Sequence, residues 1–247
     1  MVTSSKTRPH PDQMTLFEHL GELRRRLIAC AAAFVVTAIV SYIFYPRLLT
    51  FLRGPYCAVS PHNCSLNVFG PLDAFGVRLD VTAYGGVVLA SPVIIFHLWR
   101  FVTPGLKANE KRYAIPFSIA AVALFVLGGY VAWLTFPHAL VFLHAAGGSG
   151  INQLFTPQKY LTVIGALVLI FGLTFEFPVV LVALQLARVI TPAQLSKSRR
   201  IAIVAIVITS GVITPSSDPF SMLALAIPML IFYELSIVIG RMINKRR

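Results

Sequence analysis

The sequence predicts an all-α membrane protein with six transmembrane helices. The chain of 247 residues is 57% hydrophobic and only 12% charged, with a mean hydropathy of +0.78, whereas a soluble chain carries about 25% charged residues. In hydrocarbon, only helices and closed β-barrels satisfy all of their backbone hydrogen bonds. The apolar runs of this chain are long and do not alternate with polar residues, which favours a helical bundle over a barrel.

The first half of the chain contains three predicted spans. Residues 1–26 form a polar tail and an amphipathic lead-in, whose leucines recur at helical spacing and predict a helix on the cytoplasmic membrane surface. The first span covers about residues 27–45, the second 78–101 and the third 113–136. The long loop after the first span is rich in proline and apolar residues, which predicts short helices on the outer surface.

The second half of the chain is predicted to contain a long span and two short ones. The fourth span covers about residues 160–186, the fifth 201–213 and the sixth 220–240, followed by a cytoplasmic tail at 241–247. A fifth helix of 13 residues reaches only about 20 Å, against roughly 30 Å of hydrocarbon. Two short spans in a locally thinned bilayer, or one re-entrant hairpin, are both compatible with this pattern.

The basic residues predict the orientation of the chain in the membrane. Of the 21 Lys and Arg residues, 17 fall at the two termini and in the second and fourth connections, whereas four (Arg47, Arg53, Arg78 and Lys159) fall on the opposite side. Because positively charged loops stay in the cytoplasm, both termini are predicted to be cytoplasmic. The re-entrant alternative predicts the same orientation.

The composition and motifs exclude several functional classes. The net charge is +12, but the basic residues are clustered between apolar runs, so no continuous nucleic-acid face is predicted. The sequence has no phosphate-binding loop, no H-E-x-x-H motif and no G-x-S-x-G elbow. The six histidines have no metal-ligand spacing. We therefore predict neither an enzyme nor a protein with a metal or cofactor.

Two cysteines, Cys57 and Cys64, lie in the predicted outer loop, whereas Cys30 lies in the first span. Outside the cytoplasm, Cys57 and Cys64 can form a disulfide that closes a small loop. Two free thiols are the alternative, because sequence spacing does not determine the geometry of the Cβ atoms.

Glu176 is the residue around which the rest of the bundle is interpreted. It lies in the middle of the fourth apolar run, in Phe175-Glu176-Phe177-Pro178. A carboxylate in hydrocarbon is costly and normally faces a cavity or a partner, which points to a functional role. A structural pair with Thr174 or a tyrosine hydroxyl is the alternative. A proton-coupled transporter or channel that uses Glu176 and Glu234 is the rival class, although the inverted repeats that it predicts are not apparent.

Glu22 and Glu110 are two of the few acidic residues on the strongly basic cytoplasmic side. Taken by themselves, they are predicted to pair locally, Glu22 with Arg25 or Arg26 and Glu110 with Lys107 or Arg112. Such exposed pairs are common and weak.

An ordered set of motifs along the chain resembles the TatC family, the multi-spanning receptor subunit of the twin-arginine protein translocase. The segment from His19 to Leu27 is similar to the HLxELRxRL signature of that family. The similarity continues through Ser91-Pro92-Val93-Ile94, the turn from Phe101 to Arg112, Phe175-Glu176-Phe177-Pro178, the Thr214-Pro215 turn with Asp218, and Ala226-Ile227-Pro228-Met229. The resemblance implies a glove-shaped bundle and favours two true short spans over the re-entrant hairpin.

The resemblance also implies a function and reverses the interpretation of the two cytoplasmic acids. It implies that Glu22 and Glu110 receive the twin-arginine motif of a folded precursor's signal peptide, with Arg24 and Phe101 on the same recognition face. Carboxylates accept the planar guanidinium fork bidentately, which lysine does not reproduce. It further implies that Glu176 meets single-span TatA-type and TatB-type partners, that several copies of the chain assemble in one complex, and that the protein lies in a bacterial cytoplasmic membrane.

Overall fold

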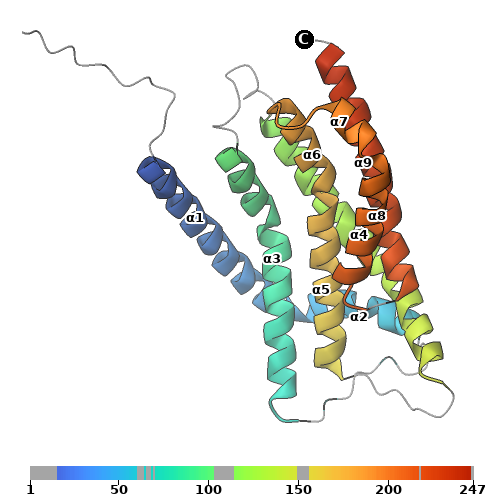
Figure 1. Ribbon diagram of the computed structural model, residues 1–247. Coiled ribbons are helices and arrows are strands. Elements are labelled where there is room, and N and C mark those ends of the chain that lie inside the picture. Colours follow the sequence, from blue (N-terminus) through green and yellow to red (C-terminus); the bar gives the residue numbers. More distant parts are fainter. Residues whose placement is uncertain are drawn as a thin grey trace, which may run out of the picture.

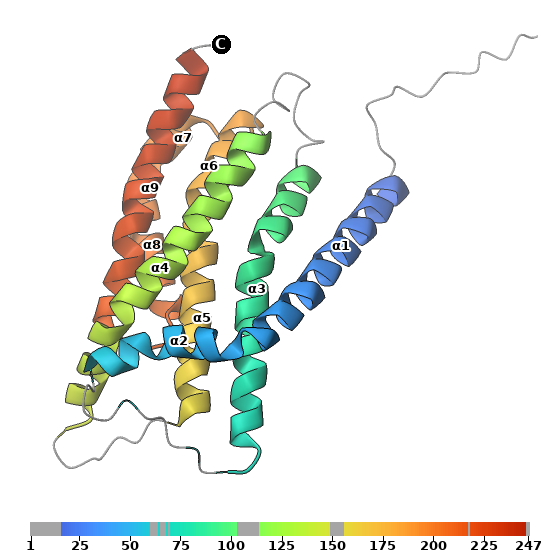
Figure 2. The ribbon, with the colours of Figure 1, turned by 180° about the vertical axis from the view of Figure 1, so that it is seen from behind.

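The computed structural model describes residues 16–59, 64, 68, 70–102, 114–148, 156–216 and 218–245, and all regular structure in these ranges is helical. The long helices run side by side and alternate in direction, and the short helix α2 lies across them near one end (Figures 1 and 2). The helices are α1 (Leu16–Ile43), α2 (Tyr45–Val59), α3 (Asp73–Val102), α4 (Ala114–Ala146), α5 (Pro157–Phe175), α6 (Phe177–Leu186), α7 (Pro192–Lys197), α8 (Arg199–Ile213) and α9 (Pro219–Lys245).

Helix α5 is the centre of the bundle and contacts α3, α4 and α9. It is apolar around most of its circumference, as expected for a helix covered by protein on several sides. Leu161, Ile164, Leu167 and Phe171 of α5 are fully buried. Because α6 continues the direction of α5 after one interruption (Figure 1), this pair of helices forms the rod against which the other helices pack.

Glycines bring α4 and α5 into close contact. A Cβ atom built on Gly128 of α4 would lie 2.6 Å from the backbone oxygen of Phe171, and one on Gly172 of α5 would lie 2.8 Å from the ring of Phe125. Membrane helices associate through such small residues because hydrophobic burial gives no driving force between them in lipid. The close α4–α5 contact therefore requires glycine, which has no side chain, at positions 128 and 172.

Helix α1 is attached to the bundle mainly through α3. The two helices are close where the Thr37 hydroxyl donates a 2.8 Å hydrogen bond to the backbone oxygen of Gly86. From this crossing they diverge toward the N-terminal end of α1 (Figures 1 and 2). Their separation at that end makes room for the cavity described below.

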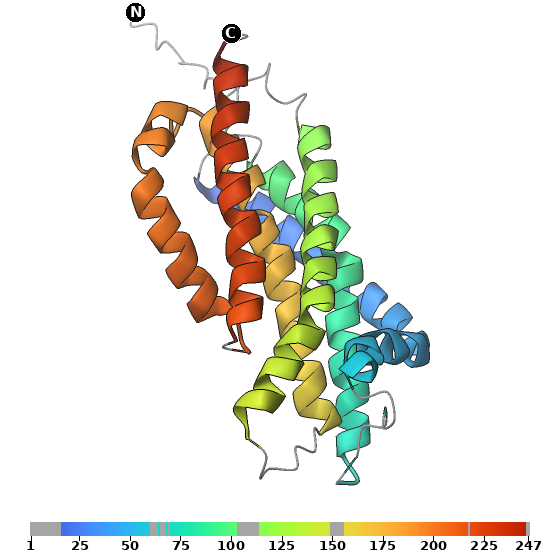
Figure 3. The same ribbon diagram turned by 90° about the vertical axis from the view of Figure 1, so that its right-hand side faces the viewer.

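Helices α8 and α9 form an antiparallel pair whose connecting turn lies short of the far ends of α3 and α5 (Figure 3). Asp218, which is 1% exposed, holds this turn: its Oδ1 accepts a 2.7 Å bond from the Ser221 amide, and its Oδ2 accepts from the Ser216 hydroxyl. This is an N-cap of the kind that begins helices with Asp.

Five segments are long and apolar enough to cross a membrane, namely Leu20–Ile43, Asp73–Phe101, Ile115–Ala146, Pro157–Leu186 and Pro219–Ile243. Helix α8 has only 15 residues, so the prediction of a short fifth helix is confirmed. The prediction of a short sixth helix is wrong, because α9 has 27 residues and passes through Pro228 without a break. Neighbouring membrane helices and local adjustments tolerate such a proline.

Two other predicted boundaries differ from the structure. The lead-in is continuous with the first span in the single 28-residue helix α1, so its described part is not a separate surface helix. Helix α4 contains Pro137 and continues to Ala146, ten residues past the predicted end at residue 136. In both places the helix is longer than the apolar run that predicted it. Residues 1–15 and 246–247 of the predicted tails lie outside the described residues.

The predicted surface helix in the first long loop is present as α2. The Nε1 of Trp133 in α4 donates a 3.1 Å hydrogen bond to the backbone oxygen of Phe51 in α2, and the two rings stack with centroids 5.2 Å apart. Cys57, in the last turn of α2, and Cys64, beyond that helix, form a disulfide with Cα atoms 4.9 Å apart. Of the two states that the sequence left open, the structure has the bridged one.

Candidate functional site

A cavity of about 880 Å³ lies between α1 and α3 at the end where these helices diverge. Its charged lining consists of one carboxylate, Glu22, and three guanidinium groups, together with the imidazole of His97. Two small residues, Gly21 and Ala29, leave room on the α1 side. The complete lining is Gly21, Glu22, Arg25, Arg26, Ala29, His97 and Arg100.

Glu22 is held by a residue one helical turn along α1. Its Oε1 accepts from Nη2 of Arg26 in an ion pair, and the Nη1 of Arg26 donates a 3.1 Å hydrogen bond to the backbone oxygen of His97 in α3. The side chains of Glu22 and Arg26 are 26% and 12% exposed. The local pair expected from spacing alone is therefore formed, with Arg26 as the partner rather than Arg25.

The second carboxylate oxygen of Glu22 is in a different state. Oε2 is buried and has no hydrogen-bond partner among the described residues, and the same holds for Nδ1 of His97. A buried acceptor without a partner costs free energy comparable to a lost hydrogen bond. An oxygen in this state, in a cavity of this size, is an acceptor that a cationic ligand can satisfy.

Glu176 occupies the interruption between α5 and α6. Its backbone oxygen accepts hydrogen bonds from the amides of Val179 and Val180, at 3.0 and 3.1 Å, which begins α6 with Pro178 in its first turn. Proline fits there because the first amides of a helix need no intrahelical acceptor. Oε1 of Glu176 is buried and has no hydrogen-bond partner among the described residues.

The direction of the Glu176 side chain follows from its neighbours on the helix. Gly172, one turn earlier, faces Phe125 of α4, and Val179, one turn later, belongs to the buried apolar cluster that also contains Phe125 and, from α3, Ile95. Residues three and four apart share a helix face, so Glu176 belongs to the face of the α5–α6 rod that is turned toward α3 and α4.

A profile of the family described as Sec-independent protein translocase protein (TatC) matches residues 18–228. The chain belongs to the TatC family. The TatC protein of Frankia casuarinae is 38% identical over 258 residues, covering 100% of this chain and 71% of its own length. That of Aquifex aeolicus is 35% identical, covering 95% of this chain and 98% of its own length. A crystal structure of the twin-arginine translocase receptor TatC in DDM superposes with a TM-score of 0.76 at 34% identity, over 90% of this chain and 99% of the other.

Among the described residues predicted for signal-peptide recognition, Glu22 alone lines the cavity. Glu22 lines the cavity, whereas Arg24 is exposed and does not line it, because two residues correspond to about 200° around a helix. Phe101 lies in the last turn of α3, next to the cavity residue Arg100, and is not part of the lining. Glu110 lies outside the described residues. Sequence reasoning did not select Arg26 and His97 as site residues, because their roles arise from the contact between α1 and α3.

Glu234 is engaged in a second ion pair. Its Oε2 accepts a 2.7 Å bond from Nη2 of Arg199 at the start of α8, and both side chains are close to half exposed. The relay that a transporter would require has Glu234 exchanging protons with Glu176, but Glu234 is instead paired with a permanent cation. Glu234 is one of the two acids that a proton-coupled transporter would use, and its ion pair with Arg199 disfavours that function.

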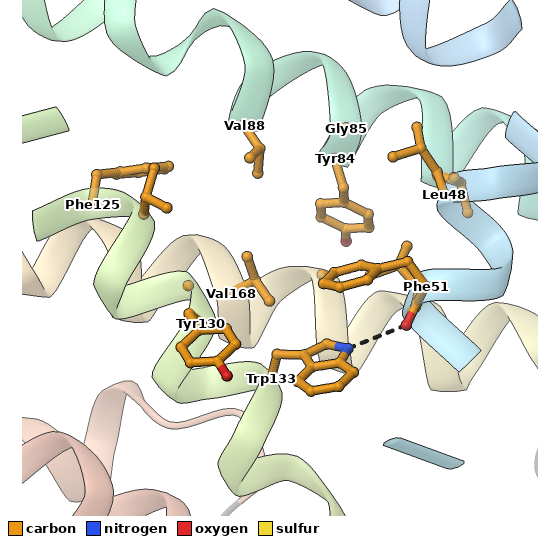
Figure 4. A pocket seen from close by; sticks show the side chains of 14 residues that line it. Leu48, Phe51, Tyr84, Gly85, Val88, Phe125, Tyr130, Trp133 and Val168 are labelled. Atoms are coloured by element: carbon orange, nitrogen blue, oxygen red, sulfur yellow. Dashed lines mark hydrogen bonds between the residues drawn. The ribbon is translucent and has the colours of Figure 1, made fainter. Parts of the chain in front are cut away.

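An apolar pocket of about 250 Å³ lies where α2 crosses the bundle (Figure 4). Helices α2, α3, α4 and α5 all contribute to it, among them through Phe51, Val88, Trp133 and Val168, and no charged residue lines it. Gly165 in its wall lies about 16 Å, or three helical turns, from Glu176 on the same face of α5. The pocket suits hydrocarbon rather than an ion.

Metal chemistry has no support in the described ranges. No three His, Cys, Asp or Glu side chains within them are arranged to hold a metal ion.

Proposed function

We propose that this protein is the receptor subunit of a twin-arginine protein translocase and that the cavity around Glu22 receives an arginine of the signal peptide. The observation that carries the proposal is the buried Oε2 of Glu22, which has no hydrogen-bond partner among the described residues, in a cavity otherwise lined by three arginines, His97 and two small residues. A guanidinium that enters this cavity gains a charge-assisted hydrogen bond. Surrounding arginines repel cations that lack a matching geometry, which favours specificity over simple charge attraction.

Glu110 completes the site in this proposal, with Arg24 and Phe101 at its edge. Two carboxylates are needed because each adjacent arginine of the motif requires an acceptor. Glu22 lies near the start of α1, and Glu110 belongs to the connection between α3 and α4, which begins beside the cavity residue Arg100. The end of α3 and the start of α4, which this connection joins, lie at the same end of the bundle as the start of α1 (Figure 1).

The first prediction tests the receptor role with peptides. Glu22→Gln is expected to weaken binding of an Arg-Arg signal peptide by about 10- to 100-fold, because hydrogen bonds to charged groups contribute about 1.5–3 kcal/mol. Adding Glu110→Gln is expected to abolish binding. The measurement is fluorescence titration of purified protein in lipid nanodiscs with Arg-Arg and Lys-Lys versions of one peptide.

Glu234→Gln is the matched control, since it removes an acid that is already paired with Arg199 and lies away from the cavity. Its binding is expected to equal that of the unmodified protein. Unchanged binding in the Glu22→Gln, Glu110→Gln double variant would show that these acids do not receive the signal peptide. Uptake of a small solute by the purified protein alone would support the transporter instead.

The membrane orientation in this proposal has both termini in the cytoplasm, and α8 is a short fifth span that brings the total to six, in a bacterial cytoplasmic membrane. The start of α1, the end of α3 and the end of α9 all lie at one end of the bundle (Figure 1). Described basic residues at this end include Arg25, Arg100, Arg200 and Lys245. The positive-inside rule places such an end in the cytoplasm.

Glu176 is proposed to bind the membrane helix of a TatA-type or TatB-type partner in an assembly with several copies of this chain. Its buried Oε1 has no hydrogen-bond partner in the described part of the chain, and an acceptor in hydrocarbon is satisfied by a polar group on an incoming helix. We expect Glu176→Ala to reduce co-purification of the partner subunits at least severalfold while Arg-Arg peptide binding is retained. Co-purification at the unmodified level would identify Glu176 as a structural residue.

A further inference from the structure

Arg26 occupies a position between the two walls of the cavity. Its Nη2 donates to Oε1 of Glu22 within α1, and its Nη1 donates to the backbone oxygen of His97 on α3 at 3.1 Å. With 12% of its side chain exposed, it is the more buried member of its ion pair. One guanidinium thus bridges the carboxylate of Glu22 and a backbone carbonyl 71 residues further along the chain than Arg26. The planar, forked guanidinium suits such a bridge better than the single ammonium of a lysine.

The neighbouring arginines do not share this role. Arg25 lines the same cavity but is exposed, and Arg24 is exposed outside it. In the described part of the chain, the ion pair of Glu22 is with Arg26. The chain's own arginine therefore holds one oxygen of the carboxylate, and Oε2 is buried without a hydrogen-bond partner among the described residues.

We propose that Arg26 is an internal occupant of the arginine site that competes with an incoming arginine and limits the affinity of the site for it. This inference rests on the proposed receptor function. A ligand guanidinium that meets Oε2 must displace Arg26 from Oε1 before it can be held bidentately. The free energy needed to break the Arg26–Glu22 ion pair therefore weakens the net binding of the ligand. Arg26 stays nearby through its bond to the His97 carbonyl.

The effect of Arg26 on the affinity of each ligand depends on the hydrogen bonds that the ligand makes with Glu22. An arginine replaces the lost bond of Arg26 with a second bond of the same geometry. A lysine offers a compact ammonium that makes one bond to Oε2 and leaves Arg26 in place, so it experiences the repulsion of the cavity arginines without the second bond. Removing Arg26 is therefore expected to help arginine, which must displace it, more than lysine, which does not.

The test compares Arg26→Gln with Arg25→Gln, which removes the same charge from the same cavity. In nanodiscs, we expect Arg26→Gln to bind the Arg-Arg peptide about tenfold more tightly and the Lys-Lys peptide only about two- to threefold more tightly, so that the ratio of the two affinities rises. Arg25→Gln is expected to raise both affinities equally, by about two- to threefold, through charge alone. Arg26→Lys, which keeps the charge and loses the fork, is expected to raise the ratio by an intermediate amount.

Several outcomes would overturn the inference. Weaker binding by Arg26→Gln would make Arg26 a residue that positions Glu22, and an unchanged Arg-Arg to Lys-Lys ratio would reduce its effect to charge. If Arg26→Gln does not fold, the ratio for Arg26→Lys decides in the same way. Failure of the receptor role itself is separate: it would appear as an unmodified protein, or a Glu22→Gln variant, whose peptide binding does not depend on the arginines.

Discussion

Replacing Gly128 by valine should separate α4 from α5 and destabilise the protein by about 3 kcal/mol, at the upper end of the range for overpacked cores. A Cβ atom at this position would lie 2.6 Å from the backbone oxygen of Phe171 and 2.9 Å from the Phe175 ring. The oxygen belongs to the backbone of a buried helix, so it cannot rotate away as a flexible side chain would. The helices themselves must move apart.

The separation is expected to reach the functional residue as well, because Glu176 directly follows Phe175. The measurement is the midpoint of thermal unfolding in detergent, followed by co-purification of the partner subunits. Gly211→Ala is the matched control: the nearest atom to its Cβ would be the Met222 sulfur at 3.5 Å, an ordinary contact, so this change should stabilise α8 by roughly 0.5–1 kcal/mol. Equal unfolding midpoints for Gly128→Val and the unmodified protein would contradict the close α4–α5 contact.

Asp218→Ala should destabilise the pair of helices α8 and α9 by about 2–4 kcal/mol. The change removes the N-cap of α9, which contributes about 1 kcal/mol. The cap is the bond from the Ser221 amide, and the change also leaves the Ser216 hydroxyl without its acceptor. Ser216 is 8% exposed, so water does not readily replace the carboxylate, and the unsatisfied hydroxyl adds about 1–3 kcal/mol.

Asp218→Asn separates the cap from the charge. Its side-chain oxygen still accepts from the Ser221 amide, so we expect a loss smaller than half of that for alanine. The measurement is limited proteolysis at the turn between α8 and α9, together with the thermal midpoint. An alanine variant as resistant to cleavage as the unmodified protein would show that the turn is held by something other than this carboxylate.

Much of the helical arrangement was predictable because hydrophobicity and charge act locally along the chain. The order of apolar segments, the surface helix α2 and the shortness of α8 all follow from composition within a window. The boundaries at Pro137 and in α9 were not predictable in this way. A proline inside a helix removes one hydrogen bond, and whether the helix continues past it depends on the neighbouring helices.

For the candidate site, too, some features follow from neighbours in the chain and others from contacts between distant segments. The sequence by itself determined that Glu176 is an acid within an apolar span and that Glu22 lies among arginines, since both facts concern neighbours in the chain. Only the tertiary structure decided which arginine takes Glu22, because Arg26 is selected by the backbone oxygen of His97, 71 residues away on another helix. Contacts between distant segments depend on how helices cross, and the crossing of α1 and α3 is set by their packing near Gly86 rather than by any residue of the site.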